Sequence, residues 1–261
     1  MNERHTTFPS ALEAFFLVVC TWAIEYLMIC AMYDIRRWLG VDDFYGLATI
    51  ARVLASGLIF TALLHWKNLD YRDLFHAPQT TTAATMAAVV PLVLLATPCL
   101  FLVMGELNDL LQAAFPPGSD VSERCKDMLA PRPPQIIMVC VLAPVVEEML
   151  FRGIILRSFL RQYERGYAIL GSAVVFGFAH MNIYQLVGGI TFGVAAGWLY
   201  ERSRSLIPGM VMHAVINSGV MLLANTGAGT ADNNPTTLAL MLLPALPACY
   251  MLRRVLAGPV Q

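Results

Sequence analysis

The stretch LAPVVEEMLFRG, from Leu142 to Gly153, places two adjacent glutamates and an arginine inside a run of apolar residues. Apolar segments flank it on both sides, PQIIMVCV before it and IILRSFL after it. Charged side chains are costly in a membrane span, and where they occur they mark a functional site by default. The stretch therefore predicts a membrane helix that carries a functional site.

The composition of the whole chain supports a membrane protein. Of its 261 residues, 57% are hydrophobic and 13% are charged, whereas soluble domains carry about 25% charged residues. A net charge of −1 argues against a nucleic-acid partner. The six cysteines have no metal-type spacing and suggest neither a disulfide framework nor a zinc site. The N-terminal apolar run lacks a small-residue cleavage site, so we expect it to be retained rather than removed as a signal peptide.

Hydrophobic segments of about 20 residues, the length that crosses a bilayer, recur along the chain. They predict an all-α, polytopic membrane protein with about eight transmembrane helices, forming one domain over residues 1–261 with a motif-bearing core at 134–224. The predicted spans are 11–33, 46–66, 81–104, 134–156, 167–181, 184–200, 206–224 and 237–257. The fifth and sixth are short and nearly contiguous, which favours a tight hairpin or tilted helices. The segment KNLDYRDLFHAPQTT is expected to be a short interfacial stretch, and the polar, proline-rich residues after the third span are expected to form its longest connection.

The distribution of lysine and arginine between the loops predicts the orientation in the membrane. One face collects ten basic residues: Arg4, Lys67, Arg72, Arg157, Arg161, Arg165, Arg202, Arg204, Arg253 and Arg254. The other face has five: Arg36, Arg37, Arg124, Lys126 and Arg132. Because basic residues accumulate on the cytoplasmic side, both termini are expected to be cytoplasmic.

The charged residues of the fourth span divide between two helix faces. Glu148 and Arg152 are four residues apart, so they share a face and can pair. Glu147 is rotated by about 100° from Glu148 on a helix of 3.6 residues per turn. We therefore expect Arg152 to neutralise Glu148 and Glu147 to face a cavity, although a purely structural charge cluster is an alternative.

Polar side chains in later spans could complete a site. His180 closes the segment FGFAH, and Phe176, one turn earlier, could wall a pocket beside its imidazole. His213 and Asn217 are also one turn apart and could together stabilise an oxygen that gains negative charge. Each histidine taken alone could equally be a hydrogen-bonding residue between helices.

Two further features are expected to hold helices together. Gly189, Gly193 and Gly197 form a stripe of small residues, which favours close helix packing. Glu25 in the first span and Arg52 in the second could pair across adjacent helices, and we favour this structural role over substrate binding.

Three motifs, read together, resemble those of the CPBP family, which includes the type II CAAX prenyl endopeptidases and the bacterial bacteriocin-processing (ABI) proteins. EEMLFR resembles its EExxxR motif, FGFAH its FxxxH motif and HAVIN its HxxxN motif, in the same order and on successive hydrophobic segments. The motifs cover residues 147–217, and the predicted layout of spans extends the likeness over most of the chain.

The resemblance implies a glutamic-type intramembrane endopeptidase that uses no metal or other cofactor. Glu147 and His180 would activate the attacking water, and His213 and Asn217 would stabilise the tetrahedral oxyanion. Glu148 and Arg152 would shape the site and tune Glu147. The implied partners are the lipid bilayer and a membrane-anchored protein or peptide substrate, while the oligomeric state stays open.

Alternatives remain at this point. Glu147, His180 and His213 could instead ligate zinc with Glu148 as the base, a possibility that chelator sensitivity would test. A transporter with a proton relay, or a non-catalytic scaffold, would also retain intramembrane charges, but we find no inverted repeat. The compact loops suggest a bacterial inner-membrane protein, for which a leader peptide or C-terminal sorting signal is a better substrate than a prenylated CAAX tail.

Overall fold

The computed structural model describes residues 7–40, 42–76, 83–226 and 235–257. Within these ranges the regular structure is helical, apart from one isolated β-bridge between His76 and Ser205. The all-α prediction is therefore confirmed. The helices are α2 (Ala11–Leu39), α3 (Phe44–Lys67), α4 (Tyr71–Phe75), α5 (Ala83–Ala114), α6 (Ser119–Met128), α7 (Pro133–Ile136), η1 (Ile137–Leu142), α8 (Ala143–Glu148), η2 (Met149–Leu156), α9 (Arg157–Gln162), α10 (Arg165–Phe178), α11 (Ile183–Ser203), α12 (Ile207–Thr226) and α13 (Pro235–Val255).

Five helices in the described part of the chain are long and apolar enough to cross a membrane: Ala11–Trp38, Phe44–Lys67, Met86–Ala114, Ile183–Ser203 and Ile207–Thr226. These make the chain an integral, multi-pass membrane protein, but the predicted number of eight is not confirmed. The fourth predicted span is divided among α7, η1, α8 and η2, and the fifth is the 14-residue α10. Neither forms one element of spanning length.

The fourth predicted span contains two π-helical segments. η1 and η2 lie immediately before and after α8, which carries both glutamates of the opening stretch. Pro144, in the first turn of α8, lacks a backbone N–H, and its ring crowds the carbonyl four residues earlier, which accounts for the widened turns of η1. Widened turns of this kind occur often at functional sites.

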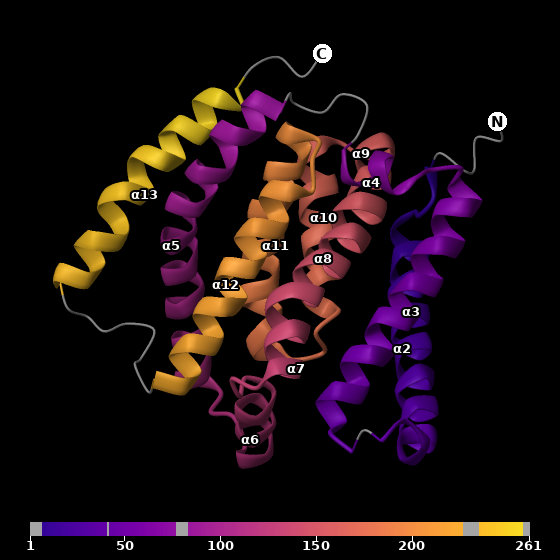
Figure 1. Cartoon of the computed structure of the whole chain (residues 1–261). Helices are drawn as coiled ribbons and strands as arrows, with labels where there is room; N and C mark the ends of the chain where they lie inside the picture. The colour runs from indigo at the N-terminus through magenta and orange to yellow at the C-terminus, as the bar shows by residue number, and fades with distance from the viewer. Residues whose placement is uncertain (1–6, 41, 77–82, 227–234, 258–261) are drawn as a thin grey trace.

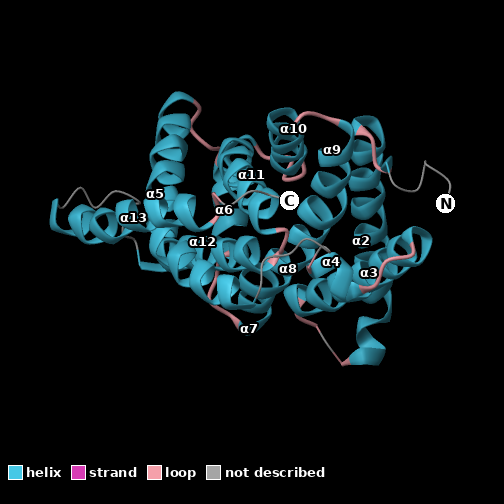
Figure 2. Ribbon diagram, turned by 90° about the horizontal axis from the view of Figure 1, so that it is seen from above, coloured by secondary structure: helices cyan, strands magenta, loops and turns pink. Residues whose placement is uncertain are grey.

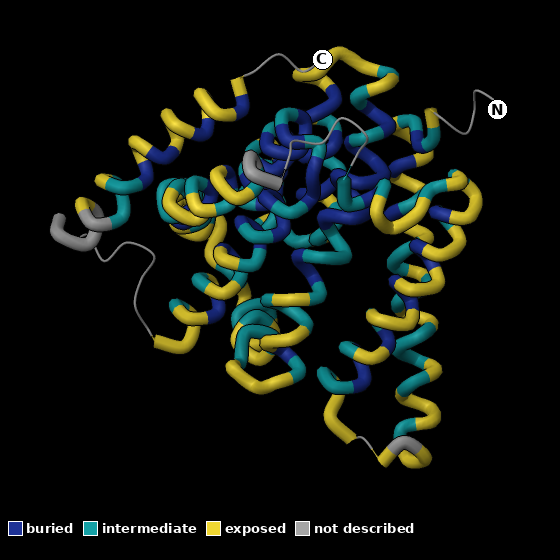
Figure 3. Tube along the Cα trace, turned by 45° about the horizontal axis from the view of Figure 1, so that its top comes forward, coloured by how far each residue is buried: buried dark blue, intermediate teal, exposed yellow. Residues whose placement is uncertain are grey.

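The helices α8, η2, α10, α11 and α12 form the centre of the molecule. The α2–α3 hairpin lies on one side of this centre, and α5 with α13 lies on the other (Figure 1). The same grouping is visible from above (Figure 2). The burial pattern agrees, since dark-blue segments concentrate in the centre and the outer helices carry much exposed surface (Figure 3). The charged residues of α8 and η2 therefore lie in the best-packed part of the fold.

The predicted hairpin of the fifth and sixth spans is present as α10 and α11. Their turn places Met181 at φ +47°, and Asn182 caps α11 by accepting a hydrogen bond from the backbone N–H of Tyr184 at 2.9 Å. The glycine stripe allows the two backbones to approach. A Cβ added at Gly193 would lie 2.8 Å from Cα of Ala173 on α10. The packing role predicted for the stripe is confirmed.

The polar segments differ in part from the expectation. The third span was predicted to end at residue 104, but α5 continues to Ala114. The connection that follows contains the exposed helix α6. The described part of the expected interfacial stretch contains α4, where Arg157 donates a hydrogen bond to the carbonyl of Asp73 at 2.7 Å. Residues 77–81 of that stretch lie outside the described residues.

Candidate functional site

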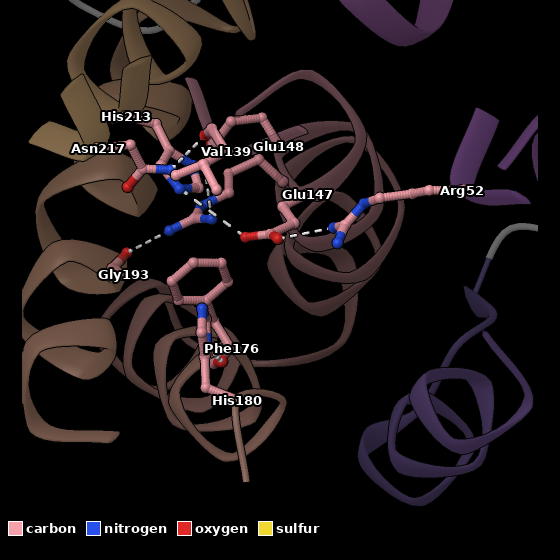
Figure 4. A network of polar contacts seen from close by, with 10 residues as sticks. Arg52, Val139, Glu147, Glu148, Phe176, His180, Gly193, His213 and Asn217 are labelled. Carbon is pink, nitrogen blue, oxygen red and sulfur yellow. Dashed lines mark hydrogen bonds and ion pairs between the residues drawn. The ribbon is translucent and has the colours of Figure 1, made fainter. Parts of the chain in front are cut away.

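Glu148 and Arg152 form a fully buried ion pair. Arg152 Nη1 lies 2.8 Å from Glu148 Oε1, and both side chains are 1% exposed. The guanidinium also donates to the carbonyl of Gly193 at 3.4 Å and packs against the ring of Phe176, 4.6 Å from its centroid (Figure 4). The predicted pairing within one helix face is present, and further contacts to α10 and α11 hold it in place.

Glu147 is directed away from this pair, as the helical spacing predicted, but it is not free. Its Oε1 lies 2.8 Å from Nη2 of Arg52 on α3 (Figure 4). Nε of the same arginine lies 3.9 Å from Glu25 on α2. The expectation that Arg52 would pair with Glu25 is therefore incomplete, because the guanidinium lies between two carboxylates and is closer to Glu147.

His213 joins the two glutamates. Its Nδ1 lies 3.3 Å from Glu148 Oε1, and its Nε2 lies 3.8 Å from Glu147 Oε2. The imidazole is buried and packs against Phe192, with ring centroids 4.6 Å apart. One imidazole from α12 thus contacts both carboxylates of α8.

The ring of Phe176 connects the two predicted histidines. It lies edge-on to His180 at 4.9 Å and to His213 at 5.9 Å between ring centroids. Nδ1 of His180 is 2.9 Å from the carbonyl of Phe176, which can only accept a hydrogen bond. Nδ1 is therefore the protonated nitrogen, and in the neutral imidazole Nε2 keeps a lone pair that can accept a proton. Phe176 thus lies beside the imidazole of His180, as the spacing of the two residues predicted.

Asn217 bonds to the backbone of the fourth predicted span. Its Nδ2 donates to the carbonyl of Val139, in the π-helical segment η1, at 2.8 Å. An amide nitrogen has two hydrogens, so this bond orients the side chain and leaves one N–H for another acceptor. The widened turns of η1 thus supply the carbonyl that orients Asn217.

Sequence reasoning missed a close contact at Gly209 on α12. A Cβ added there would lie 2.7 Å from Oε2 of Glu148. Only glycine lets α12 approach the buried carboxylate this closely. The available signal was its position, since Gly209 lies one helical turn before His213.

Two residues beside the histidine motif have structural contacts. Asn182 caps α11, and the hydroxyl of Tyr184 donates to the carbonyl of Phe115 at 2.9 Å.

In the described ranges, no group of three or more His, Cys, Asp or Glu side chains is arranged to hold a metal ion.

Comparison with known proteins finds a family whose model matches the part of the chain that carries this geometry. Residues 130–219 match the family model of the type II CAAX prenyl endopeptidases described as Rce1-like. The match covers about a third of the chain, and it is this part that is similar to the family. The matched residues run from α7 into α12 and include all the residues of the three motifs. The family resemblance seen in the sequence is thereby confirmed.

One curated relative is the Bacillus subtilis protein described as "Putative membrane peptidase YdiL". It is 26% identical over 105 residues, which cover 40% of this chain and 43% of that protein. The similarity thus spans less than half of either chain. No solved structure gives a significant match.

Proposed function

We propose that this chain is an intramembrane endopeptidase that hydrolyses a peptide bond of a membrane-associated protein or peptide. The observation that supports it most is the contact of His213 with both carboxylates of α8, at 3.3 and 3.8 Å, inside a bundle of apolar helices. Helix packing does not require two carboxylates and an imidazole together in an apolar bundle, whereas general acid–base chemistry uses such groups.

In this proposal Glu147 and His180 activate water. Glu147 is the accessible member of the glutamate pair, since its side chain is 17% exposed and that of Glu148 is 1% exposed. The water oxygen attacks the carbonyl carbon while its proton passes to the base. The proton then reaches the amide nitrogen and the C–N bond breaks, which gives an amine and a carboxylic acid. The acid then loses its proton to the amine or to water.

His213 and Asn217 are proposed to stabilise the oxyanion of the tetrahedral intermediate. With Nδ1 directed at Glu148, His213 can donate from Nε2 when it is an imidazolium, and the two carboxylates of α8 would balance that charge. The second N–H of Asn217 is available for the same oxygen. Removing one such donor typically lowers the rate by about 10²–10³-fold.

Glu148 and Arg152 are proposed to have a supporting role. They orient His213 through its Nδ1 and hold α8 against α11 through the carbonyl of Gly193. A zinc-dependent variant of the reaction, with Glu148 as base, is the alternative to be tested, and inhibition of cleavage by a chelator would support it.

For topology we propose eight membrane passes, a bacterial inner membrane and cytoplasmic termini. Clustering of basic residues at one end of the bundle supports this orientation. Arg165 of α10 pairs with Glu201 of α11 at 2.9 Å, and Arg157 of α9 donates a hydrogen bond to the backbone of α4 at 2.7 Å. The helices α4 and α9 lie at the same end of the bundle (Figure 1). This matches the rule that basic residues stay cytoplasmic.

The proposed substrate is a membrane-anchored protein that loses a leader peptide or a C-terminal sorting signal. A prenylated CAAX protein is the alternative, supported by the name of the matching family. Both classes present a peptide bond close to a membrane anchor, so the site would have to admit it from the level of the bilayer.

The test compares membrane-protein termini in host cells that express wild type or Glu147→Ala. New termini present only with the wild type are the expected result, and they would also name the substrate. Equal expression of the two proteins, checked by immunoblot, is the control. Identical termini in both strains, with the protein present and folded, would contradict the proposal and favour a scaffold or transporter.

A further inference from the structure

Arg52 forms the only charged contact to Glu147 from outside the three motifs among the residues that the structure describes. It lies on α3, 95 positions before Glu147 in the chain, and the two side chains meet at 2.8 Å. On its other side the same guanidinium lies 3.9 Å from Glu25 of α2. Three helices are thereby connected by charge at the level of the glutamates.

We propose that Arg52 is a positioning residue for the carboxylate of Glu147, and that Glu25 in turn orients Arg52. This inference rests on the proposed role of Glu147 as the base. It assigns a function in the reaction to α2 and α3, both of which lie outside the region of the family match.

The geometry of the carboxylate shows what Arg52 contributes. Oε1 of Glu147 is held by Arg52, while Oε2 faces Nε2 of His213 at 3.8 Å. With contacts on both oxygens, rotation of the carboxylate about its last bond is restricted. Oε1 is engaged at hydrogen-bonding distance and Oε2 is not, so Oε2 is the oxygen left to accept a proton from water.

The charge of Arg52 has a second consequence. Arginine stays protonated under all physiological conditions, and an opposite charge at this distance favours the ionised form of a carboxyl group. The guanidinium therefore stabilises the carboxylate form, which a base requires. Glu25 contacts the guanidinium from the other side, so Arg52 of α3 lies between a carboxylate of α2 and a carboxylate of α8.

Exposure separates this arrangement from a purely structural ion pair. The side chains of Arg52 and Glu147 are 24% and 17% exposed, against 1% for both members of the Glu148–Arg152 pair. Exposed ion pairs contribute little to stability. A positioning role is therefore the better account of an ion pair that the protein only partly encloses.

The first test uses turnover of the substrate identified by the terminus comparison, with purified protein in lipid nanodiscs. Arg52→Gln is expected to lower kcat by about 10- to 100-fold, because small misplacement of a catalytic group has effects of this size, with KM changed less than about threefold. Arg52→Lys should recover part of the loss, and Glu25→Gln should give a smaller decrease. The matched control is Arg165→Gln, which removes an ion pair to Glu201 remote from the site.

The second test does not depend on activity. Dicyclohexylcarbodiimide modifies protonated carboxyl groups in membranes, and mass spectrometry can quantify it at Glu147 and Glu148 separately. Arg52→Gln should raise labelling of Glu147 at least about threefold relative to Glu148, since an adjacent opposite charge favours the ionised form. Arg165→Gln should leave the ratio unchanged.

The outcomes separate the two proposals. Wild-type turnover and an unchanged labelling ratio in Arg52→Gln would overturn the role of Arg52, even if the chain is a protease. Reduced turnover with an unchanged ratio and a lower unfolding temperature would also overturn it, in favour of a structural ion pair. Absence of cleavage by the wild type would overturn the proposed function, and with it the role in catalysis, whatever the labelling shows.

Discussion

Two ion pairs stand next to each other on one helix of this molecule, and they are built differently. Glu148 pairs with Arg152 from the next turn, both side chains are 1% exposed, and His213 and Gly193 contact the pair from other helices. Glu147 pairs with Arg52 of a distant helix, and those side chains are 17% and 24% exposed. Glu148 thus has a buried partner on the next turn of its own helix, whereas Glu147 has a partly exposed partner on another helix.

The difference follows from helical geometry and separates two roles. A rotation of about 100° between neighbouring residues directs Glu148 into the core and Glu147 toward α3. A carboxylate sealed in the core can orient other groups but cannot meet water, whereas an accessible one can exchange protons. Variants of the Glu147 pair should therefore lower turnover, whereas variants of the Glu148 pair should lower the stability of the fold.

The largest effect is expected for Glu147→Gln. The amide oxygen can still accept a hydrogen bond from Arg52, so the fold should be retained, but the base is lost. General-base catalysis typically contributes about 10²–10⁴-fold, and we expect turnover to fall by at least that factor. Turnover and thermal unfolding, measured on the same nanodisc sample, check this. Cleavage at the wild-type rate would remove Glu147 from the mechanism.

The next effect is on stability, at the sealed pair. Arg152→Gln leaves Glu148 charged and without its cation in the core, which typically costs about 3–5 kcal/mol. Arg52→Gln, at the accessible pair, should cost on the order of 1 kcal/mol or less. Chemical denaturation in detergent micelles measures both.

A matched control for this second prediction replaces both members of the sealed pair. Glu148→Leu combined with Arg152→Met should regain most of the stability lost in Arg152→Gln, since apolar residues of similar size often replace a buried ion pair at little cost. Equal losses in Arg52→Gln and Arg152→Gln would show that the two pairs do not differ as described.

The fold could be predicted from the sequence where local rules apply. Hydrophobic lengths indicated the five helices that are long enough to cross a membrane. The two short, contiguous segments indicated the α10–α11 hairpin, and four-residue spacing indicated its glycine stripe. The end of α5 could not be found this way. Hydropathy falls in GELNDLLQAA, but leucine, glutamine and alanine favour a helix, so the helix continues past the apolar part to Ala114. The π-helical turns could not be predicted because six to eight residues are too few to distinguish their period from 3.6 residues per turn.

The contacts of the site could likewise be predicted only between residues that are close in the sequence. The Glu148–Arg152 pair follows from a four-residue spacing, which a helix always brings together. The Arg52–Glu147 pair joins residues 95 positions apart, and only the packing of α3 beside η1 and α7 creates it. The sequence marked Arg52 as unusual, since it is charged within an apolar span, but assigned it to Glu25 alone. No local rule connects it to Glu147.

Asn217→Ala should have an intermediate effect on turnover. It removes one of two proposed oxyanion donors, which typically costs about 10²–10³-fold, and it also leaves the carbonyl of Val139 without this bond. Asn217→Asp is the informative comparison, because a carboxylate of the same size would repel the oxyanion and should be at least as inactive. An Asn217→Ala variant with wild-type turnover would leave Asn217 as a packing residue that holds η1 against α12.

The smallest effect tests how tightly the sealed pair is enclosed. In Gly209→Ala the new Cβ would lie 2.7 Å from Oε2 of Glu148, so α12 or the carboxylate has to move. Such overpacking typically costs about 1–3 kcal/mol, and turnover should fall as well, because His213 lies one turn further along α12. Gly57→Ala on α3 is the control, since its Cβ meets nothing within 4 Å and alanine favours a helix by up to about 1 kcal/mol over glycine. If neither Gly209→Ala nor Gly57→Ala changes unfolding or turnover, the core around Glu148 can rearrange to fit a methyl group. The contrast between an enclosed Glu148 and an accessible Glu147 would then be wrong.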